Sequence, residues 1–278
     1  MSHRTLLPLL TAAVGALTLA ACGGDPVGGD ASAATGSGES RLTVGASTVP
    51  HGEILQFVAD ELAADAGLSI EIVEFTDYVQ PNVALDEGAL DANYFQHQPY
   101  LDQQVADAGY DFVALAPVHL EPLGVYSDSV GSLEEIPEGG TVAIPNDPSN
   151  GGRALALLAD KGLITLAETE AAPTVLDIED NPKGLEFSEI EAAQLPRSLA
   201  DVDAAVINGN YAIEADLSPA EDAIAAEAAE GNPYANLLVV RAEDEGDAAL
   251  ASLVELLQSE EVAAFIEENY GGAVVPAS

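Results

Sequence analysis

Hydrophobic and polar positions recur with two periods along the chain, and they predict that strands and helices alternate. Short apolar or alternating runs, typical of strands, occur at residues 42–47, 68–75, 90–95, 141–145, 173–178, 185–190, 204–207 and 237–241. Apolar residues spaced by three or four positions predict helices at 51–66, 79–85, 99–108, 150–161, 208–215 and, as a pair, 246–269. This order predicts an α/β fold with largely parallel sheets.

The chain from residue 41 onward is long enough for two lobes. About 238 residues follow the N-terminal region, and two sheets of four or five strands fit that length better than one large sheet. Two crossing segments, near Glu121 and near Ala235, would join the two sheets. One lobe would contain 41–121 and 236–278, and the other 122–235. A ligand cleft would then lie between the lobes.

The N-terminus has the pattern of a secretory signal. A basic start and an apolar run at 5–21 lead to Cys22, the only cysteine of the chain. The tetrapeptide that ends at Cys22 resembles a bacterial lipobox, in which the thiol receives a diacylglycerol. We therefore expect a signal peptide at 1–21, a lipidated Cys22 with a flexible tether to residue 40, and a protein held on the outer face of a membrane. The alternative is an ordinary secretory leader cut near Ala21.

Charge narrows the range of partners. The chain has 48 acidic and 7 basic side chains, and removal of the leader, which contains Arg4, leaves a formal charge of −42. Nucleic acid is excluded as a partner, because no basic cluster is available to neutralise phosphates. The acids are spread along the mature chain and 48% of residues are hydrophobic, which indicates a folded, acid-coated protein. Adaptation to high salt is our hypothesis for this coat.

Aromatic and amide side chains gather near the expected strand ends. Five of the fourteen Phe and Tyr residues lie between positions 75 and 100, and an aromatic box that could hold an apolar or sulfur-containing side chain would consist of Tyr78, Tyr94, Phe95 and Tyr100. Core packing is the alternative. Four amides follow predicted strands and could bind both halves of a zwitterion: Asn146, Asn150, Asn208 and Asn210. Asparagine is also an ordinary turn residue.

Few residues suggest ion binding, metal binding or catalysis. Arg153 lies in the first turn of a predicted helix, where it could grip a carboxylate or form a salt bridge with a surface acid. The spacing of His51, His97 and His119 matches no compact metal motif, so we expect no metal. No cofactor fingerprint and no nucleophile motif occur in the sequence. These observations favour a binding protein over an enzyme, with a surface hydrolase as the weaker alternative.

Five motifs, in the same order, identify a family resemblance. The segments 74–82, 91–100, 143–153, 191–197 and 205–211 closely resemble the NlpA family of lipoproteins, the methionine-binding receptors of ABC importers. The resemblance implies a two-lobed periplasmic-binding-protein fold without a cofactor or catalytic activity. It implies as partners methionine or a related amino acid, a membrane permease and its ATPase. A receptor for another small apolar amino acid or short peptide, and a metal receptor, remain alternatives.

The same resemblance implies roles for individual residues. Arg153 and Asn150 would hold the ligand carboxylate, and Asn208 and Asn210 would bind the amino acid backbone. The ligand side chain would be enclosed by Tyr78, Phe95, His97 and Tyr100, with His97 placed for a polar contact near the sulfur; Tyr94 and Asn146 are further candidates. We also expect Arg153→Ala to abolish binding with little effect on the stability of the unliganded protein.

Overall fold

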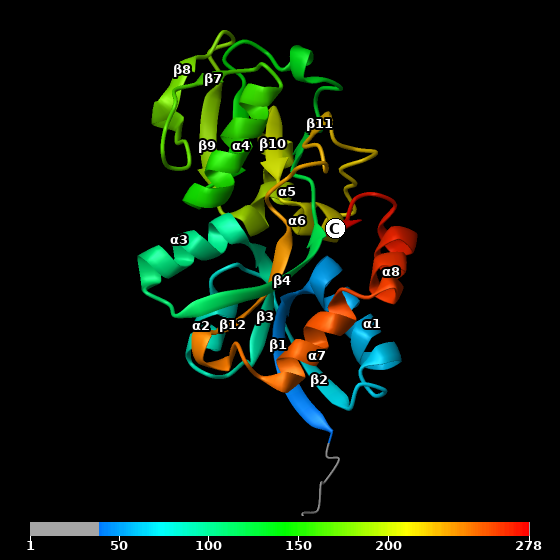
Figure 1. The fold of residues 1–278 in the computed structure, drawn as a ribbon. Helices are drawn as coiled ribbons and strands as arrows, with labels where there is room; N and C mark the ends of the chain where they lie inside the picture. The colour runs from blue at the N-terminus through cyan, green and yellow to red at the C-terminus, as the bar shows by residue number, and fades with distance from the viewer. Residues whose placement is uncertain (1–38, 278) are drawn as a thin grey trace, which may run out of the picture. The chain divides into compact units, whose positions relative to one another are not determined.

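Two mixed β-sheets organise residues 39–277, the part of the chain that this computed structural model describes (Figure 1). The expected signal peptide, Cys22 and most of the tether lie outside the described residues. Among the helices that the structure describes, none is long and apolar enough to cross a membrane.

The first sheet has six strands in the order β13-β4-β12-β3-β1-β2. Its strands are β1 (Ser40–Ser47), β2 (Leu68–Phe75), β3 (Ala92–His97), β4 (Phe112–Leu120), β12 (Asn236–Arg241) and β13 (Val275–Pro276). β1 runs parallel to β2 and β3, and Val44 pairs with Ile72 on one side and Ala92 on the other. β12 is antiparallel to β3 and β4, and β13 is antiparallel to β4.

Helices cover both faces of this sheet. One face packs against α1 (Glu53–Phe57), α7 (Ala248–Leu257) and α8 (Glu260–Tyr270), and the other against α2 (Gln80–Asp86) and α3 (Gln98–Ala108). The helix expected at 51–66 consists of α1 and a π-helical turn at 58–62 that continues it. Val49, shortly before it, is extended (φ −129°, ψ 138°) and separates it from the preceding residues. Gly67, at φ +70°, closes the turn that follows and leads into β2.

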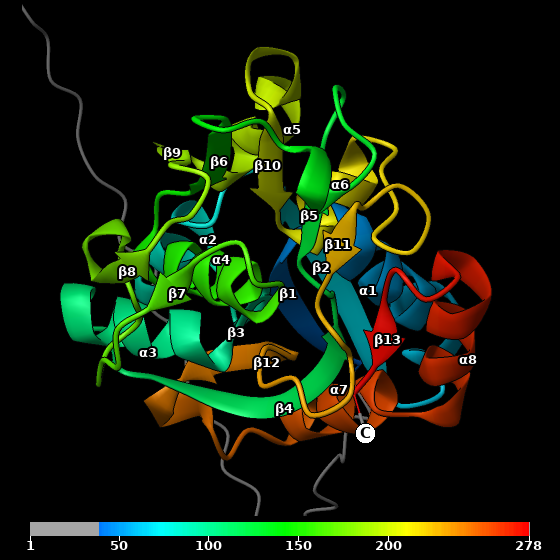
Figure 2. The same ribbon diagram turned by 90° about the horizontal axis from the view of Figure 1, so that it is seen from above.

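The second sheet has five strands in the order β11-β5-β10-β6-β9. They are β5 (Gly124–Tyr126), β6 (Thr141–Pro145), β9 (Glu186–Ile190), β10 (Ala204–Ile207) and β11 (Ala225–Ala226). β6 is parallel to β9 and β10, whereas β5 is antiparallel to β10 and β11. α4 (Pro148–Asp160) packs on one face, and α5 (Leu195–Ser198) and α6 (Gly209–Glu214) pack on the other (Figure 2).

Most expected elements are confirmed, and three expectations need correction. The first sheet has six strands, whereas sheets of four or five strands were expected, because the short C-terminal β13 adds to its edge. The sheets are mixed, not largely parallel. β12 starts from the second sheet beside the end where β4 leaves the first, so it runs opposite to both β4 and β3. The strand expected at 173–178 is instead a short 3₁₀ turn, Val175–Asp177, followed by β8 (Ile178–Asp180), which pairs with β7 (Thr165–Leu166). A capping box between Thr174 and Asp177 favours the turn.

The chain passes between the sheets twice. It leaves the first sheet after β4, enters the second at β5, and returns before β12. The C-terminal end of β4 and the N-terminal end of β12 lie side by side, because these antiparallel strands are hydrogen-bonded neighbours. Both crossings therefore lie at the same edge of the first sheet. Side chains near these crossings can therefore contact residues of both sheets.

Candidate functional site

A small cavity lies where strand ends of the first sheet meet helix starts of the second. Its lining comes from both sides of the two crossings: Tyr78, Phe95, Gln96, His97, Tyr100, Glu121, Asn150, Arg153, Asn208, Gly209, Asn210 and Asn236. Eight of the ten ligand-contact candidates from the sequence are thus brought together.

Three aromatic rings form one wall of the cavity. The Tyr78 ring lies 6.0 Å from Phe95 and 5.9 Å from Tyr100, and the Phe95 and Tyr100 rings are 6.1 Å apart. Tyr100 donates its hydroxyl to the backbone oxygen of Tyr78 at 3.0 Å, and Tyr78 donates its own to Asn210 Oδ1 at 2.5 Å. Burial raises the pKa of both tyrosines, so both stay protonated donors.

His97 ends β3 and caps α3, and both of its ring nitrogens are committed. Its Nδ1 accepts the backbone N–H of Tyr100 at 3.2 Å, so its Nε2 carries the proton and donates to Asn150 Oδ1 at 3.1 Å. Burial, and then the charge of Arg153, lower the pKa of His97 to about 3. His97 is therefore a neutral residue that joins the two sides of the cavity, through a contact that the sequence did not predict.

The amides differ in what they can still bind. Asn150 Nδ2 donates to both carboxylate oxygens of Asp147, which caps α4, and its Oδ1 also accepts Asn208 Nδ2 at 2.8 Å. Asn150 has little remaining capacity and mainly orients its neighbours. Asn208 Oδ1, in contrast, is buried without a hydrogen-bond partner in the described part of the chain. An unpaired buried acceptor in a cavity lining is suited to a ligand donor.

Arg153 is buried and ion-paired, with only 4% of its surface exposed. Its Nε and Nη2 donate to the two oxygens of Glu227 at 2.8 and 2.5 Å, and Nη2 also donates to the Glu121 backbone oxygen at 3.0 Å. The Tyr234 ring stacks 4.2 Å from the guanidinium carbon. Burial alone would raise the pKa of Glu227, but the hydrogen bonds and charge of Arg153 lower it overall. Arg153 thus has a buried salt bridge and also lines the cavity, and its hydrogen bonds within the described residues use Nε and Nη2 but not Nη1.

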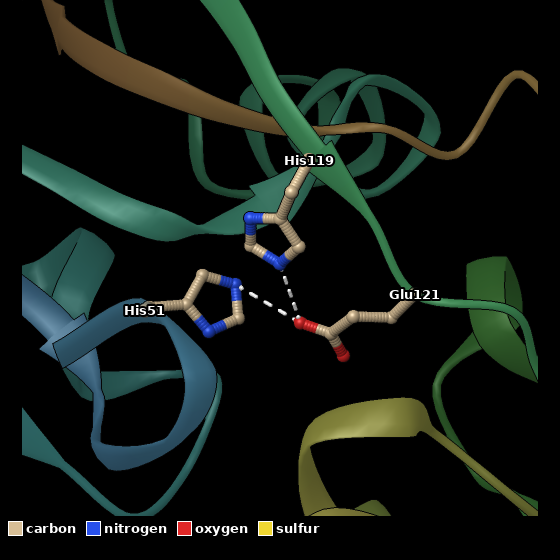
Figure 3. A group of neighbouring side chains, drawn as sticks. All are labelled: His51, His119 and Glu121. Atoms are coloured by element: carbon tan, nitrogen blue, oxygen red, sulfur yellow. Dashed lines mark hydrogen bonds and ion pairs between the residues drawn. The ribbon is translucent and has the colours of Figure 1, made fainter. Parts of the chain in front are cut away.

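A buried carboxylate, Glu121, sits at the first crossing (Figure 3). Its Oε1 lies 2.8 Å from His119 Nε2 and 3.4 Å from His51 Nε2, and the latter is also 3.1 Å from Asn236 Oδ1. The Tyr94 hydroxyl is hydrogen-bonded to His119 Nδ1. Burial lowers the pKa of His51 to about 4 and of His119 to about 3, and it raises the pKa of Glu121.

The same three side chains are the described group whose donor atoms could hold a metal, since those atoms lie within 4.8 Å of one another. Both Nε2 atoms, however, already face oxygen acceptors at hydrogen-bonding or near hydrogen-bonding distance, and His119 Nδ1 faces Tyr94. The cluster of His51, His119 and Glu121 thus forms a hydrogen-bond network, in which the buried His51 Nδ1 is the ring nitrogen without a partner among the described residues.

Two sequence candidates lie away from the cavity lining. The Tyr94 ring contacts His51 and His119 within the core, on the side of β3 opposite Phe95. Asn146 is exposed, and its backbone N–H donates to the Ile190 oxygen at 2.9 Å. Asn146 therefore extends the pairing of β6 with β9 at this position.

The sequence reasoning missed four lining residues: Gln96, Glu121, Gly209 and Asn236. Glu121 and Asn236 lie at or next to the two crossings expected near Glu121 and Ala235, so their position was an available signal. Gly209 has no side chain that sequence reasoning could single out. The structure nevertheless requires glycine there, because a Cβ would be 2.6 Å from Glu121 Cβ.

Comparisons with known proteins agree with this architecture. The profile described as NlpA lipoprotein matches residues 42–278. The D-methionine-binding lipoprotein MetQ of Escherichia coli K12 is 41% identical over 268 residues, which cover 95% of this chain and 94% of that protein. A nutrient binding protein from Burkholderia cenocepacia, solved bound to methionine, is 49% identical with a TM-score of 0.82, covering 85% of this chain and 100% of that one.

A third relative bears on the fold. The structure described as an ABC transporter, periplasmic substrate-binding protein from Coxiella burnetii is 41% identical with a TM-score of 0.82, covering 85% of this chain and 100% of that one. The two-lobed periplasmic-binding-protein fold expected from the sequence is confirmed. On the match over residues 42–278, the chain belongs to the NlpA lipoprotein family.

Proposed function

We propose that this protein is a lipid-anchored receptor that binds methionine outside the cytoplasm and delivers it to an ABC importer. One observation carries the proposal: a single buried cavity combines an aromatic wall, a guanidinium and a carboxylate. A zwitterion with an apolar side chain is complementary to that combination. The names of relatives that are 41–49% identical, which mention methionine, support the same ligand.

The cavity offers a separate group to each part of the ligand. Arg153 would donate to the ligand carboxylate, and charge-assisted hydrogen bonds of this kind contribute roughly 1.5–3 kcal/mol each. Asn208 Oδ1, which has no partner among the described residues, is an acceptor, so it would take a hydrogen bond from the ligand ammonium. Glu121 offers an acceptor to the ammonium group. The rings of Tyr78, Phe95 and Tyr100 surround the side chain, and a thioether gains about 0.3–1.5 kcal/mol from aromatic contacts.

Contacts across the cavity support a receptor that closes over its ligand. Tyr78 reaches Asn210 and His97 reaches Asn150, each pair joining a residue before the first crossing to one after it. Such contacts exclude water from a bound amino acid and strengthen its electrostatic interactions. We propose that residues 41–121 with 236–278 and residues 122–235 form the two lobes that separate when ligand leaves.

Anchoring and delivery complete the proposal. A diacylglycerol on Cys22 would hold the receptor at the membrane surface, with residues up to 40 as the tether. A permease and its ATPase would accept the ligand, and the receptor would hydrolyse nothing itself. Since the mature chain carries a formal charge of −42, docking on the permease would depend strongly on ionic strength.

Mass spectrometry tests the ligand directly. Protein expressed from Gly23 onward is measured under native conditions and again after denaturation, and release of methionine is the expected result. Thermal shift assays with methionine, its sulfoxide and its D-isomer follow. An empty protein that none of these ligands stabilises would remove methionine as the substrate, and another small apolar amino acid, a short peptide or a metal would then be tested.

A further inference from the structure

We infer that His51 and His119 are positioning residues that hold Glu121 as a charged anchor for the ligand's free amino group, and so make the receptor selective for amino acids over analogues without that group. This inference rests on the proposed function and goes beyond it, because neither histidine lines the cavity.

The protonation of both imidazoles follows from their neighbours. His119 Nε2 lies 2.8 Å from a carboxylate oxygen, so this nitrogen carries the proton and Nδ1 accepts from the Tyr94 hydroxyl. His51 Nε2 faces two oxygen acceptors, from Asn236 and Glu121, and an unprotonated nitrogen there would be repelled by both. Each histidine is therefore a neutral N–H donor aimed at the same side of Glu121.

The two oxygens of Glu121 consequently have different roles. Both imidazoles approach Oε1, and Oε2 is turned away from them toward the ribbon of α6 (Figure 3). A Cβ on Gly209 would be only 2.9 Å from Oε2, so glycine keeps this side of the carboxylate open. Because Glu121 also lines the cavity, Oε2 is the oxygen left for a ligand. Holding Oε1 fixes the direction of Oε2.

Charge at the site favours an ammonium group. The histidines are neutral and Arg153 is already paired with Glu227 through two hydrogen bonds, so the charge of Glu121 has no dedicated cation among the described residues. The other groups that face or influence Glu121 are the backbone of Asn210 and the uncharged phenols of Tyr78, Tyr94 and Tyr270. Arg153, Glu227 and Glu121 together carry one net negative charge, which one ammonium neutralises.

The histidines make this arrangement possible in a buried place. A carboxylate removed from water without donors takes up a proton and can no longer attract a cation. The His119 N–H donates to Oε1, and the His51 N–H, which is hydrogen-bonded to Asn236, points its positive end to within 3.4 Å of the same oxygen. Both stabilise the ionised form, yet they add no positive charge that would compete with the ligand. A lysine or arginine at either position would neutralise Glu121 and remove its attraction for ammonium.

Isothermal titration with two ligands tests the inference. Methionine is compared with its α-hydroxy acid, which keeps the side chain and carboxylate but lacks the ammonium, at pH 7.5 with EDTA present. The wild type should prefer methionine by on the order of 10- to 100-fold, and Glu121→Gln should remove most of that preference. His119→Leu and His51→Leu should each reduce it by about tenfold, and His119→Gln, which can still donate, should reduce it less.

His97→Leu is the matched control, because His97 is also a buried, neutral histidine but contacts Asn150 instead of Glu121. It should weaken both ligands by similar factors and leave their ratio unchanged. If His119→Leu weakens both ligands equally, the histidine has only a structural role and the inference fails. A dependence of methionine affinity on added zinc would overturn it as well, since an ion would then occupy the donors.

A measurement on the wild type guards against variants that do not fold. Nitrogen-15 NMR of the histidine side chains should show Nε2 protonated and Nδ1 unprotonated in both His51 and His119, and an unprotonated Nε2 in either one overturns the inference. Failure of the proposed function looks different: the wild type would then bind neither methionine nor its hydroxy analogue. Binding by the wild type with an unchanged ratio in the leucine variants contradicts only the role of the histidines.

Discussion

Replacing His97 with glutamine should make the stability of the unliganded protein less sensitive to acid. Both ring nitrogens of His97 are in use, one accepting the Tyr100 N–H and the other donating to Asn150. An added proton would place two N–H groups against each other at Tyr100, inside a buried site that also faces Arg153. Glutamine offers an acceptor and a donor and does not titrate in this range.

The expected size follows from proton linkage. The pKa of His97 is about 3 in the folded protein and about 6.5 in the unfolded chain. Between these values only the unfolded state binds the proton, so stability is lost as the pH falls below about 6.5 and the loss continues toward pH 3. Over the interval from 6.5 to 5, at about 1.4 kcal/mol per pH unit, His97 should cost the wild type about 2 kcal/mol.

Urea unfolding of both proteins at pH 7 and pH 5, at fixed ionic strength, measures this cost. The 48 acidic side chains also titrate toward low pH, but they are common to both proteins and cancel in the difference. Ligand must first be removed by unfolding and refolding, because a bound ligand adds its own stabilisation. The free energy of unfolding of the wild type, relative to His97→Gln, should fall by about 2 kcal/mol between the two pH values. Parallel curves would show that His97 is not held neutral by its surroundings, and would refute the reasoning.

Three further predictions concern the cavity and the surface. Arg153→Ala should abolish amino acid binding by calorimetry, and the structure changes our expectation for stability: it should lower the free energy of unfolding by about 3 kcal/mol because Glu227 is left buried and unpaired. The double variant Arg153→Ala/Glu227→Ala should recover part of that lost stability. If the losses in unfolding free energy of the two single variants simply added up in the double variant, the result would contradict a buried ion pair. Phe95→Ala should weaken methionine by about 1–3 kcal/mol and alanine by much less, whereas equal losses in titrations with both would indicate a role in the fold alone. The melting temperature should rise from 0.1 to 1 M salt as the Debye length falls from about 10 to 3 Å, and a flat profile would remove the proposed salt adaptation.

The sequence predicts the scaffold well because the determinants of the scaffold are local. The periodic pattern locates β2 and β6 at their observed bounds, and Gly67 is correctly placed at the end of a helical unit. Turn chemistry was the local signal that we overlooked, since the side chains of Thr174 and Asp177 specify a 3₁₀ turn where a strand was expected. The antiparallel return of β12 depends on which neighbours it finds, and no local pattern encodes that.

The charged part of the site depends on distant pairs, and this explains why it was only half predicted. Arg153 was found because cations are scarce in this chain, but its partner Glu227 is 74 residues away and is one of 48 acids. His51 and Asn236, 185 positions apart, meet only because both crossings pass the start of the first helix.

Burial is what separates Glu121 from the other acids. Exposed carboxylates on this surface are hydrated and screened by salt, so no single one of them can be strongly selective for a ligand. Glu121 is 5% exposed, accepts a hydrogen bond from the neutral His119 and lies 3.4 Å from the neutral His51, so its attraction for an ammonium should be screened far less. If the hypothesis of salt adaptation holds, the same residue type would serve two purposes in one chain, as a solvated coat that tolerates salt and as a buried anchor. A receptor that works in concentrated salt would require the anchoring carboxylate to be isolated from the solvated ones, and the burial of Glu121 at the crossing between the two sheets would provide that isolation.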